Sequence, residues 1–391
     1  MTSAYNSPLL FDGHRIRKDV SIHISKNLIT QVAPANASLP SLPSGYLVAP
    51  GLIDIQVNGG GGKLFNDSPD EETAAYIADS HALAGTTTLL VTLITDELSK
   101  LDNGINAVQH CIKSGHPGIA GIHLEGPYID PQRRGIHSEQ WIQSGESLNP
   151  DQLCNLKKDG ITLITLAPEH VHPQKIKDLT QSGAIVFAGH TNCTDAEFKV
   201  ALDAGVQGVT HLFNAMSQIG PRQMGVTGTT LINPNIWAGI ILDGHHVGIE
   251  NFKLVTGMGR MERTILVSDA MGVAASSITE FDLYGEQIKV VDGRCLNTQN
   301  VLAGSSVTLS ECVRIAIRKY GLAAEDALAS ASTRPAELLG LQTRKGYLRI
   351  GHDADLVVFD GQFHVAGCMQ AGRWIHANDT LRESLQMGGA H

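Results

Sequence analysis

Short apolar runs alternate with longer, more polar segments through the middle of the chain. Runs rich in Val, Ile, Leu and Thr predict buried β-strands at residues 52–57, 86–94, 119–124, 161–166, 184–189, 207–211, 238–242 and 264–269. Eight such strands, joined by helices or loops over roughly 250 residues, are typical of a TIM-type (β/α)8 barrel with a parallel sheet. The pattern therefore predicts an α/β fold.

Two of the connecting segments carry clear signals for the ends of helices. Ser68 is a suitable N-cap, followed by Pro69 at the first helical position, and this helix should end near Gly85. Thr194 and Glu197 predict a capping box for a second helix. Two further helices are expected at residues 306–320 and 323–339, and a hairpin turn at 292–293.

Strand-rich segments flank the barrel on both sides. Residues 20–24 alternate between apolar and polar side chains, and residues 355–359 form an apolar run close to the C-terminus. We therefore expect a small β-sandwich domain built from both termini, residues 1–49 and 345–391, with the barrel at residues 50–344 inserted between them.

Composition and charge exclude several classes of function. The 391 residues include 29 Lys and Arg against 39 Asp and Glu, a net charge of −10, which argues against nucleic acid or an anionic membrane as the main partner. Six scattered cysteines without a Cys-x-x-Cys pair favour reduced thiols. With no signal-peptide or membrane-spanning run, we expect a cytoplasmic protein.

Ionisable side chains are frequent where the predicted strands end. In a barrel of this kind, the C-terminal ends of the strands meet at one mouth, where chemistry takes place. The residues at these ends, in order, are Gln56, Thr92, Glu125, Ala167, His190, His211, Asp243 and Asp269. One Glu, two His and two Asp are therefore expected around a single opening.

Three of these residues form a plausible ligand set for a divalent metal. A single strand-end His is more often a structural residue, but Glu125, His190 and His211 together match a common set for catalytic zinc. Asp269 could be a simple turn cap. Beside a metal, it could instead accept a proton from a water molecule whose pKa the metal lowers to about 7.

A phosphate site is a weaker possibility. Asn214 and Ala215 follow His211 within one turn, and Arg222 lies a few residues further along, so loop amides and one guanidinium could hold an anion. An exposed Arg beside Gly and Pro is more often simply solvated. The same reservation applies to His137 and His246.

Seven motifs in order along the chain carry a resemblance to a known family. They are PGLIDIQVNG at 50–59, HLEGP at 123–127, GHTN at 189–192, THLFNAM at 210–216, DGHHV at 243–247, SDA at 268–270 and AGSS at 303–306. These motifs resemble the amidohydrolase superfamily and, within it, the N-acetylglucosamine-6-phosphate deacetylase family. Residues 353–357, DADLV, resemble the C-terminal sandwich of the superfamily.

The resemblance implies roles for individual residues. It implies that Glu125, His190 and His211 bind one zinc ion and that Asp269 and His137 are catalytic. It further implies a substrate pocket formed by Ile136, Asn214, Ala215, Arg222, Asp243, His246, Leu302, Ala303 and Gly304. The resemblance also implies a homodimer in which Arg222 and His246 reach the site of the neighbouring subunit.

One position departs from the wider superfamily. Many members carry His-x-His at the end of the first barrel strand and bind two metals, whereas this chain has Gln56, Val57 and Asn58 there. An amide is a poor ligand for a second transition metal. We therefore expect one metal in each subunit, with Gln56 bonded to a water on that metal.

The implied reaction is hydrolysis of N-acetyl-D-glucosamine 6-phosphate to acetate and D-glucosamine 6-phosphate, in amino-sugar catabolism or recycling. The same chemistry on N-acetylgalactosamine 6-phosphate or another N-acylated amine remains an alternative. A phosphosugar isomerase or aldolase would leave the Glu/His/His set unexplained, and no strand ends in a Lys. A non-catalytic scaffold should have lost metal ligands.

Overall fold

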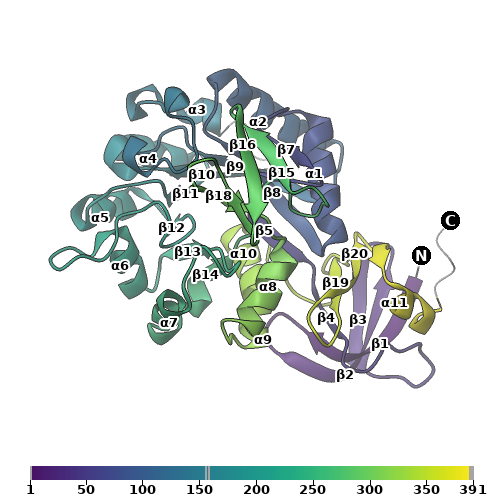
Figure 1. Cartoon of the computed structure of the whole chain (residues 1–391). Coiled ribbons are helices and arrows are strands. Elements are labelled where there is room, and N and C mark those ends of the chain that lie inside the picture. The colour runs from purple at the N-terminus through teal and green to yellow at the C-terminus, as the bar shows by residue number, and fades with distance from the viewer. Residues whose placement is uncertain (1, 155, 157–158, 387–391) are drawn as a thin grey trace.

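Eight parallel strands form the centre of the molecule in a computed structural model that describes residues 2–154, 156 and 159–386 (Figure 1). In hydrogen-bonding order the strands are β14 (Thr264–Leu266), β13 (Trp237–Ile240), β12 (Gly208–Val209), β11 (Ile185–Ala188), β10 (Ile161–Leu166), β9 (Ile119–Glu125), β8 (Thr86–Ile94) and β5 (Leu52–Val57). A parallel bridge between Val57 and Ala270 joins the first strand to the last. The sheet therefore closes almost completely into the predicted barrel.

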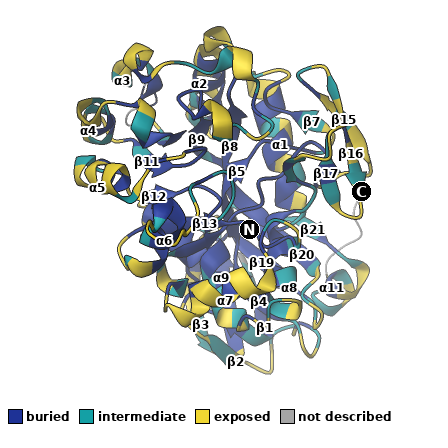
Figure 2. Cartoon of the chain, turned by 60° about the vertical axis from the view of Figure 1, so that its left-hand side comes forward, coloured by how far each residue is buried: buried dark blue, intermediate teal, exposed yellow. Residues whose placement is uncertain are grey.

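Helices cover the outside of this sheet (Figure 2). They are α1 (Glu71–Leu83), α2 (Leu98–Lys113), α3 (Pro150–Leu153), α4 (Pro173–Gln181), α5 (Asp195–Ala204), α6 (Gly225–Ile232), α7 (Ile249–Gly257), α8 (Leu309–Arg318), α9 (Ala324–Ala331) and α10 (Thr333–Leu338). Their exposed residues face outward, while the barrel strands are almost wholly buried. The apolar runs of the sequence are buried strands because this helical layer covers them.

The start of α1 differs from the prediction. Asp70, rather than Ser68, is the N-cap, because its carboxylate accepts a hydrogen bond from the Thr73 amide at 2.8 Å. The capping box of α5 is confirmed: Thr194 and Glu197 each accept a hydrogen bond from the other's backbone amide. Gly205 ends that helix with a φ of 115°, which a residue with a side chain would adopt only under strain.

The prediction of a single helix over residues 323–339 is wrong. The chain forms two helices there, α9 and α10, which meet at Ser332 with φ −140° and ψ −67°. Pro335 has no amide hydrogen, so it cannot donate to the carbonyl of Ala331 as a continuous helix requires. The chain therefore starts a new helix at Thr333, which has Pro335 in its first turn.

The two ends of the chain contribute to one seven-stranded sheet. In order its strands are β21 (Arg373–Ala377), β20 (Val365–Gln370), β19 (Leu356–Phe359), β4 (Leu47–Pro50), β1 (Thr2–Phe11), β2 (Ile16–Ser25) and β3 (Leu28–Pro34), and α11 (Asp379–Ser384) packs its buried Leu381 into the same core. The expected boundaries at residues 49 and 345 stay a prediction, and residues 1 and 387–391 lie outside the described part.

A small antiparallel sheet is inserted after β14. It consists of β15 (Glu280–Leu283), β16 (Glu286–Val291), β17 (Arg294–Leu296) and β18 (Leu302–Ser305). Asp292 and Gly293 form the predicted hairpin turn with φ values of 50° and 78°. A short two-stranded sheet, β6 (Gly59–Gly60) and β7 (Lys63–Leu64), follows β5. In the part of the chain that the structure describes, no helix combines the length and the apolar character needed to cross a bilayer.

Candidate active site

A cavity of about 180 Å³ lies at the C-terminal ends of the barrel strands. Its walls include six of the ionisable residues expected at the site: Glu125, His137, His190, His211, His246 and Asp269. The remainder of the wall is largely apolar and comes partly from Ile94, Ile241, Met271 and Leu302. Ionisable side chains thus lie close together in a small, poorly solvated space, where electrostatic interactions between them are strong.

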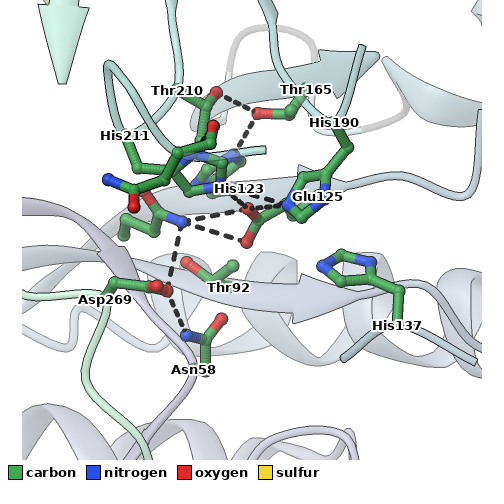
Figure 3. A network of polar contacts seen from close by, with 12 residues as sticks. Asn58, Thr92, His123, Glu125, His137, Thr165, His190, Thr210, His211 and Asp269 are labelled. Atoms are coloured by element: carbon green, nitrogen blue, oxygen red, sulfur yellow. Dashed lines mark hydrogen bonds and ion pairs between the residues drawn. The ribbon is translucent and has the colours of Figure 1, made fainter. Parts of the chain in front are cut away.

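Glu125, His190 and His211 meet at one point (Figure 3). The Nε2 atoms of His190 and His211 each lie 3.1 Å from Oε1 of Glu125 and 3.1 Å from each other. All three side chains are nearly inaccessible to solvent. The ligand atoms of a tetrahedral zinc, each about 2.0–2.1 Å from the metal, are separated by roughly 3.3 Å. The spacing of this triangle therefore fits a divalent metal.

Backbone carbonyls fix the tautomers of the two histidines. Nδ1 of His190 lies 2.8 Å from the carbonyl oxygen of Arg133, and Nδ1 of His211 lies 3.2 Å from that of Asn214. A carbonyl only accepts, so each Nδ1 carries a proton and donates it. Neutral imidazoles held in this way direct two Nε2 lone pairs at each other. A bound cation would resolve that repulsion.

A second group of potential ligands is less suited to a metal. Asp130, Glu169 and His170 have ligand atoms within 4.8 Å of one another. However, both oxygens of Glu169 already accept hydrogen bonds, from the Thr191 hydroxyl and the Asn192 amide. The oxygens of Asp130 are likewise engaged, one by the Gln132 amide and the other by His170.

The surroundings of the two carboxylates at the barrel mouth shift their pKa values in opposite directions. Burial alone would raise the pKa of Glu125, but the adjacent imidazoles of His190 and His211, when they are protonated, hold it well below its usual value. Burial, reinforced by the charge of Glu125, raises the pKa of Asp269 from 3.8 to about 6. One carboxylate is thereby kept ionised, while the other is poised to exchange a proton near neutral pH.

Two amides hold one oxygen of Asp269. The Nδ2 group of Asn58 donates to Oδ1 of Asp269 at 2.7 Å, and the Nε2 group of Gln56 donates to the same atom at 3.1 Å. Gln56 Nε2 also lies 3.1 Å from both oxygens of Glu125, so it bridges the two acids. Oδ2 of Asp269 has no such donor among the described residues.

The expected phosphate-binding residues are only partly brought together. Asn214, Ala215 and His246 line the cavity, whereas Arg222 is exposed and lies outside it. The expectation that His246 serves a neighbouring subunit differs from the structure. Its Nδ1 lies 2.7 Å from Oδ2 of Asp243, which holds the ring in the cavity of its own chain. Asp243 thus supports His246 and does not line the cavity itself.

Comparisons with known proteins agree with this arrangement. Residues 47–381 match the model of the amidohydrolase family. The chain belongs to the amidohydrolase family. It is 37% identical to the N-acetylgalactosamine-6-phosphate deacetylase of Shewanella sp. over 87% of this chain and 86% of that protein.

Other relatives are named for the epimeric sugar. This amidohydrolase is 34% identical to the N-acetylglucosamine-6-phosphate deacetylase of Bos taurus, over 85% of its length and 84% of that protein. The crystal structure of N-acetylglucosamine-6-phosphate deacetylase from Pasteurella multocida superposes with a TM-score of 0.90 at 30% identity, covering 97% of this chain and 100% of that one.

Asn58, whose amide holds Asp269 in this amidohydrolase site, was not predicted from the sequence. Asn58 is two residues beyond Gln56 in an extended segment, so period-two alternation could have placed both side chains on the same face. Among the predicted sugar-pocket residues, Leu302 and Gly304 line the cavity together with Ile136, but Ala303 does not. Ala303 faces the opposite side of β18 and is fully buried in a neighbouring apolar cluster.

The backbone at the strand ends is unusual. His190, His211, Ala215 and Asp269 all have positive φ values, between 34° and 50°, which is uncommon for residues with a side chain. Conformations of this kind cluster at functional sites, where surrounding structure holds them in place. Here they turn the chain sharply after β11, β12 and β14, so that the side chains point into the cavity.

Proposed function

We propose that this protein is a metal-dependent deacetylase that hydrolyses the acetamide of N-acetyl-D-glucosamine 6-phosphate to acetate and D-glucosamine 6-phosphate. The observation that carries the proposal is the triangle of Glu125 Oε1, His190 Nε2 and His211 Nε2, with the free oxygen of Asp269 in the same cavity. The family membership and the names of the relatives agree with it.

Glu125, His190 and His211 would hold one zinc ion in each chain, with Gln56 bonded to a water on that ion. When bound, a divalent metal polarises the acetamide carbonyl and lowers the pKa of a water molecule. Zinc suits a set of one carboxylate and two imidazoles. The anionic Glu125 offsets part of the metal's charge.

Asp269 would act first as general base and then as general acid. Its Oδ2 accepts a proton from the attacking water as the new C–O bond forms, and returns it to the sugar nitrogen as the C–N bond breaks. Asn58 and Gln56 keep Oδ1 occupied, so the exchange takes place at one defined oxygen. A pKa raised to about 6 suits both halves of this task.

His137 would donate a hydrogen bond to the acetamide oxygen, where negative charge develops. Its ring is buried in the cavity wall, with its centroid 4.3 Å from that of His190. Leu302, Gly304 and Ile136 would contact the sugar.

The phosphate would bind near Asn214, Ala215 and His246, with Arg222 supplied by a second copy of the chain in a homodimer. Among the described residues, no Lys or Arg lines the cavity. A phosphate dianion in a poorly solvated site needs a cation nearby. Arg222 is exposed and therefore free to reach a neighbour. The six scattered cysteines, all of them buried, are in keeping with a cytoplasmic location.

The galactosamine epimer is a second candidate substrate, because the Shewanella relative named for it is 37% identical to this chain. The test is acetate release from both epimeric N-acetylhexosamine 6-phosphates and from unphosphorylated N-acetylglucosamine. We expect kcat/KM to be highest for N-acetylglucosamine 6-phosphate and to fall at least about a hundredfold without the phosphate, since a lost charged contact costs roughly 3 kcal/mol or more. No acetate from either phosphosugar would refute the proposal.

A further inference from the structure

Thr95 contacts Nδ1 of His137, a residue in the wall of the cavity. It follows the last residue of β8 directly, whereas His137 lies in the loop after β9, so the two are 42 residues apart. Nδ1 of His137 lies 2.8 Å from the Thr95 hydroxyl oxygen and 3.4 Å from the Thr95 backbone nitrogen. Both residues are buried. One residue thus offers two polar groups to a single ring nitrogen.

These contacts decide which nitrogen of His137 carries the proton. A backbone N–H can only donate, so Nδ1 of His137 is the acceptor of that bond. The Thr95 hydroxyl can donate to the same atom, which strengthens the arrangement. A neutral imidazole whose Nδ1 accepts must carry its hydrogen on Nε2. This is the opposite tautomer to the one that backbone carbonyls impose on His190 and His211.

Thr95 is itself anchored through its backbone. Its hydroxyl has one hydrogen to donate, and the carbonyl oxygen of Glu125, at 3.4 Å, is a more distant acceptor than Nδ1 of His137. Its own carbonyl accepts a hydrogen bond from the hydroxyl of Tyr284, which lies in the turn between β15 and β16. The inserted sheet therefore holds the backbone of Thr95 through Tyr284, and Thr95 in turn contacts His137 in the cavity wall.

We propose that Thr95 is the positioning residue for His137, holding it as the Nε2–H tautomer so that this hydrogen points at the acetamide oxygen. The role assigned to that hydrogen rests on the proposed deacetylase function. The tautomer itself does not, because it follows from the contacts to Thr95 alone. Without the hydroxyl, only the long backbone contact would favour this tautomer, and the ring would be free to turn.

The tautomer can be measured directly. In the full-length protein labelled with 15N-histidine, the His137 resonances are identified by their loss in His137→Gln. We expect a pyridine-like Nδ1 and a pyrrole-like Nε2 in the wild type, and a shift toward the other tautomer in Thr95→Val. A pyrrole-like Nδ1 in the wild type would overturn the proposal, even if the variant did not fold.

Measurements of kcat and KM distinguish a positioning role of Thr95 from a role in packing alone. Thr95→Val should lower kcat roughly tenfold, the usual effect of one lost hydrogen bond, while KM changes less than about twofold. Thr95→Ser should restore both kcat and the resonances. The matched control is Thr88→Val in β8, the strand that Thr95 directly follows, where the hydroxyl is equally buried and has no hydrogen-bond partner among the described residues. It should change neither quantity.

A failure of the positioning role can be distinguished from a failure of the proposed deacetylase function. An equal loss of kcat in Thr88→Val, or a loss in Thr95→Val with unchanged His137 resonances, would overturn the positioning role. Absence of acetate release by the wild type would instead refute the deacetylase function, and the resonances would still decide the tautomer.

Discussion

Replacing Asp269 with Asn removes the proposed proton carrier with very little change of shape. In the wild type, Oδ1 accepts from Asn58 at 2.7 Å and from Gln56 at 3.1 Å. An asparagine at this position would keep its oxygen toward these two donors, because its NH₂ group would otherwise face them. The NH₂ group would then occupy the place of Oδ2, where it cannot accept a proton from water.

The expected loss can be estimated from this geometry. General acid–base catalysis contributes about 10²–10⁴ in rate, so kcat should fall by that factor, corresponding to roughly 3–5 kcal/mol in the barrier. KM should change little, because binding groups elsewhere in the cavity are intact. The assay is acetate release from N-acetylglucosamine 6-phosphate, with metal content measured on the same samples. A kcat within about threefold of the wild type, at unchanged metal content, would refute the role of Asp269.

Three other changes test different parts of the account. Glu125→Gln should weaken metal binding more than about a hundredfold, because loss of a residue that only hydrogen-bonds to a metal ligand already lowers metal affinity about ten- to a hundredfold. Competition with a chelator measures this affinity, and an unchanged value would contradict the assignment of Glu125 as a ligand. Burial raises the pKa of Asp54 from 3.8 to about 7, so its charge opposes folding increasingly as pH rises between those values. Relative to the wild type, Asp54→Asn should therefore gain about 3 kcal/mol of unfolding free energy between pH 5 and pH 8, and a pH-independent difference in denaturant titrations would argue against this. Thr194→Ala removes the hydroxyl of the α5 capping box and should cost about 0.5–2 kcal/mol of stability, whereas Thr88→Val should cost less.

The barrel and its central triangle were predictable because they depend on local pattern and on one general rule. Apolar runs located the strands, and parallel strands in a barrel bring their C-terminal ends together. Glu125, His190 and His211 could therefore be placed at one mouth although they are up to 86 residues apart. Where a local signal had two equivalent solutions, prediction was less reliable: both Ser68 and Asp70 can cap a helix.

The supporting residues could not be found in this way. Thr95 meets His137 only because the loop after β9 turns back over the end of β8, and no local pattern encodes that path. His246 was assigned to a neighbouring subunit, yet its pairing with Asp243 keeps it in its own cavity. Ala303 is the exception, since the alternation of side chains along β18 could have separated it from its two neighbours.

The central claim is that Glu125, His190 and His211 hold a single metal on which amide hydrolysis depends. The most direct measurement is acetate release from N-acetylglucosamine 6-phosphate by the purified protein, before and after a chelator and again after stoichiometric zinc, with the metal content of each sample. We predict loss of activity as metal is removed, and recovery that saturates at one zinc per chain. Full activity in metal-free protein, or saturation only at two ions per chain, would contradict the account.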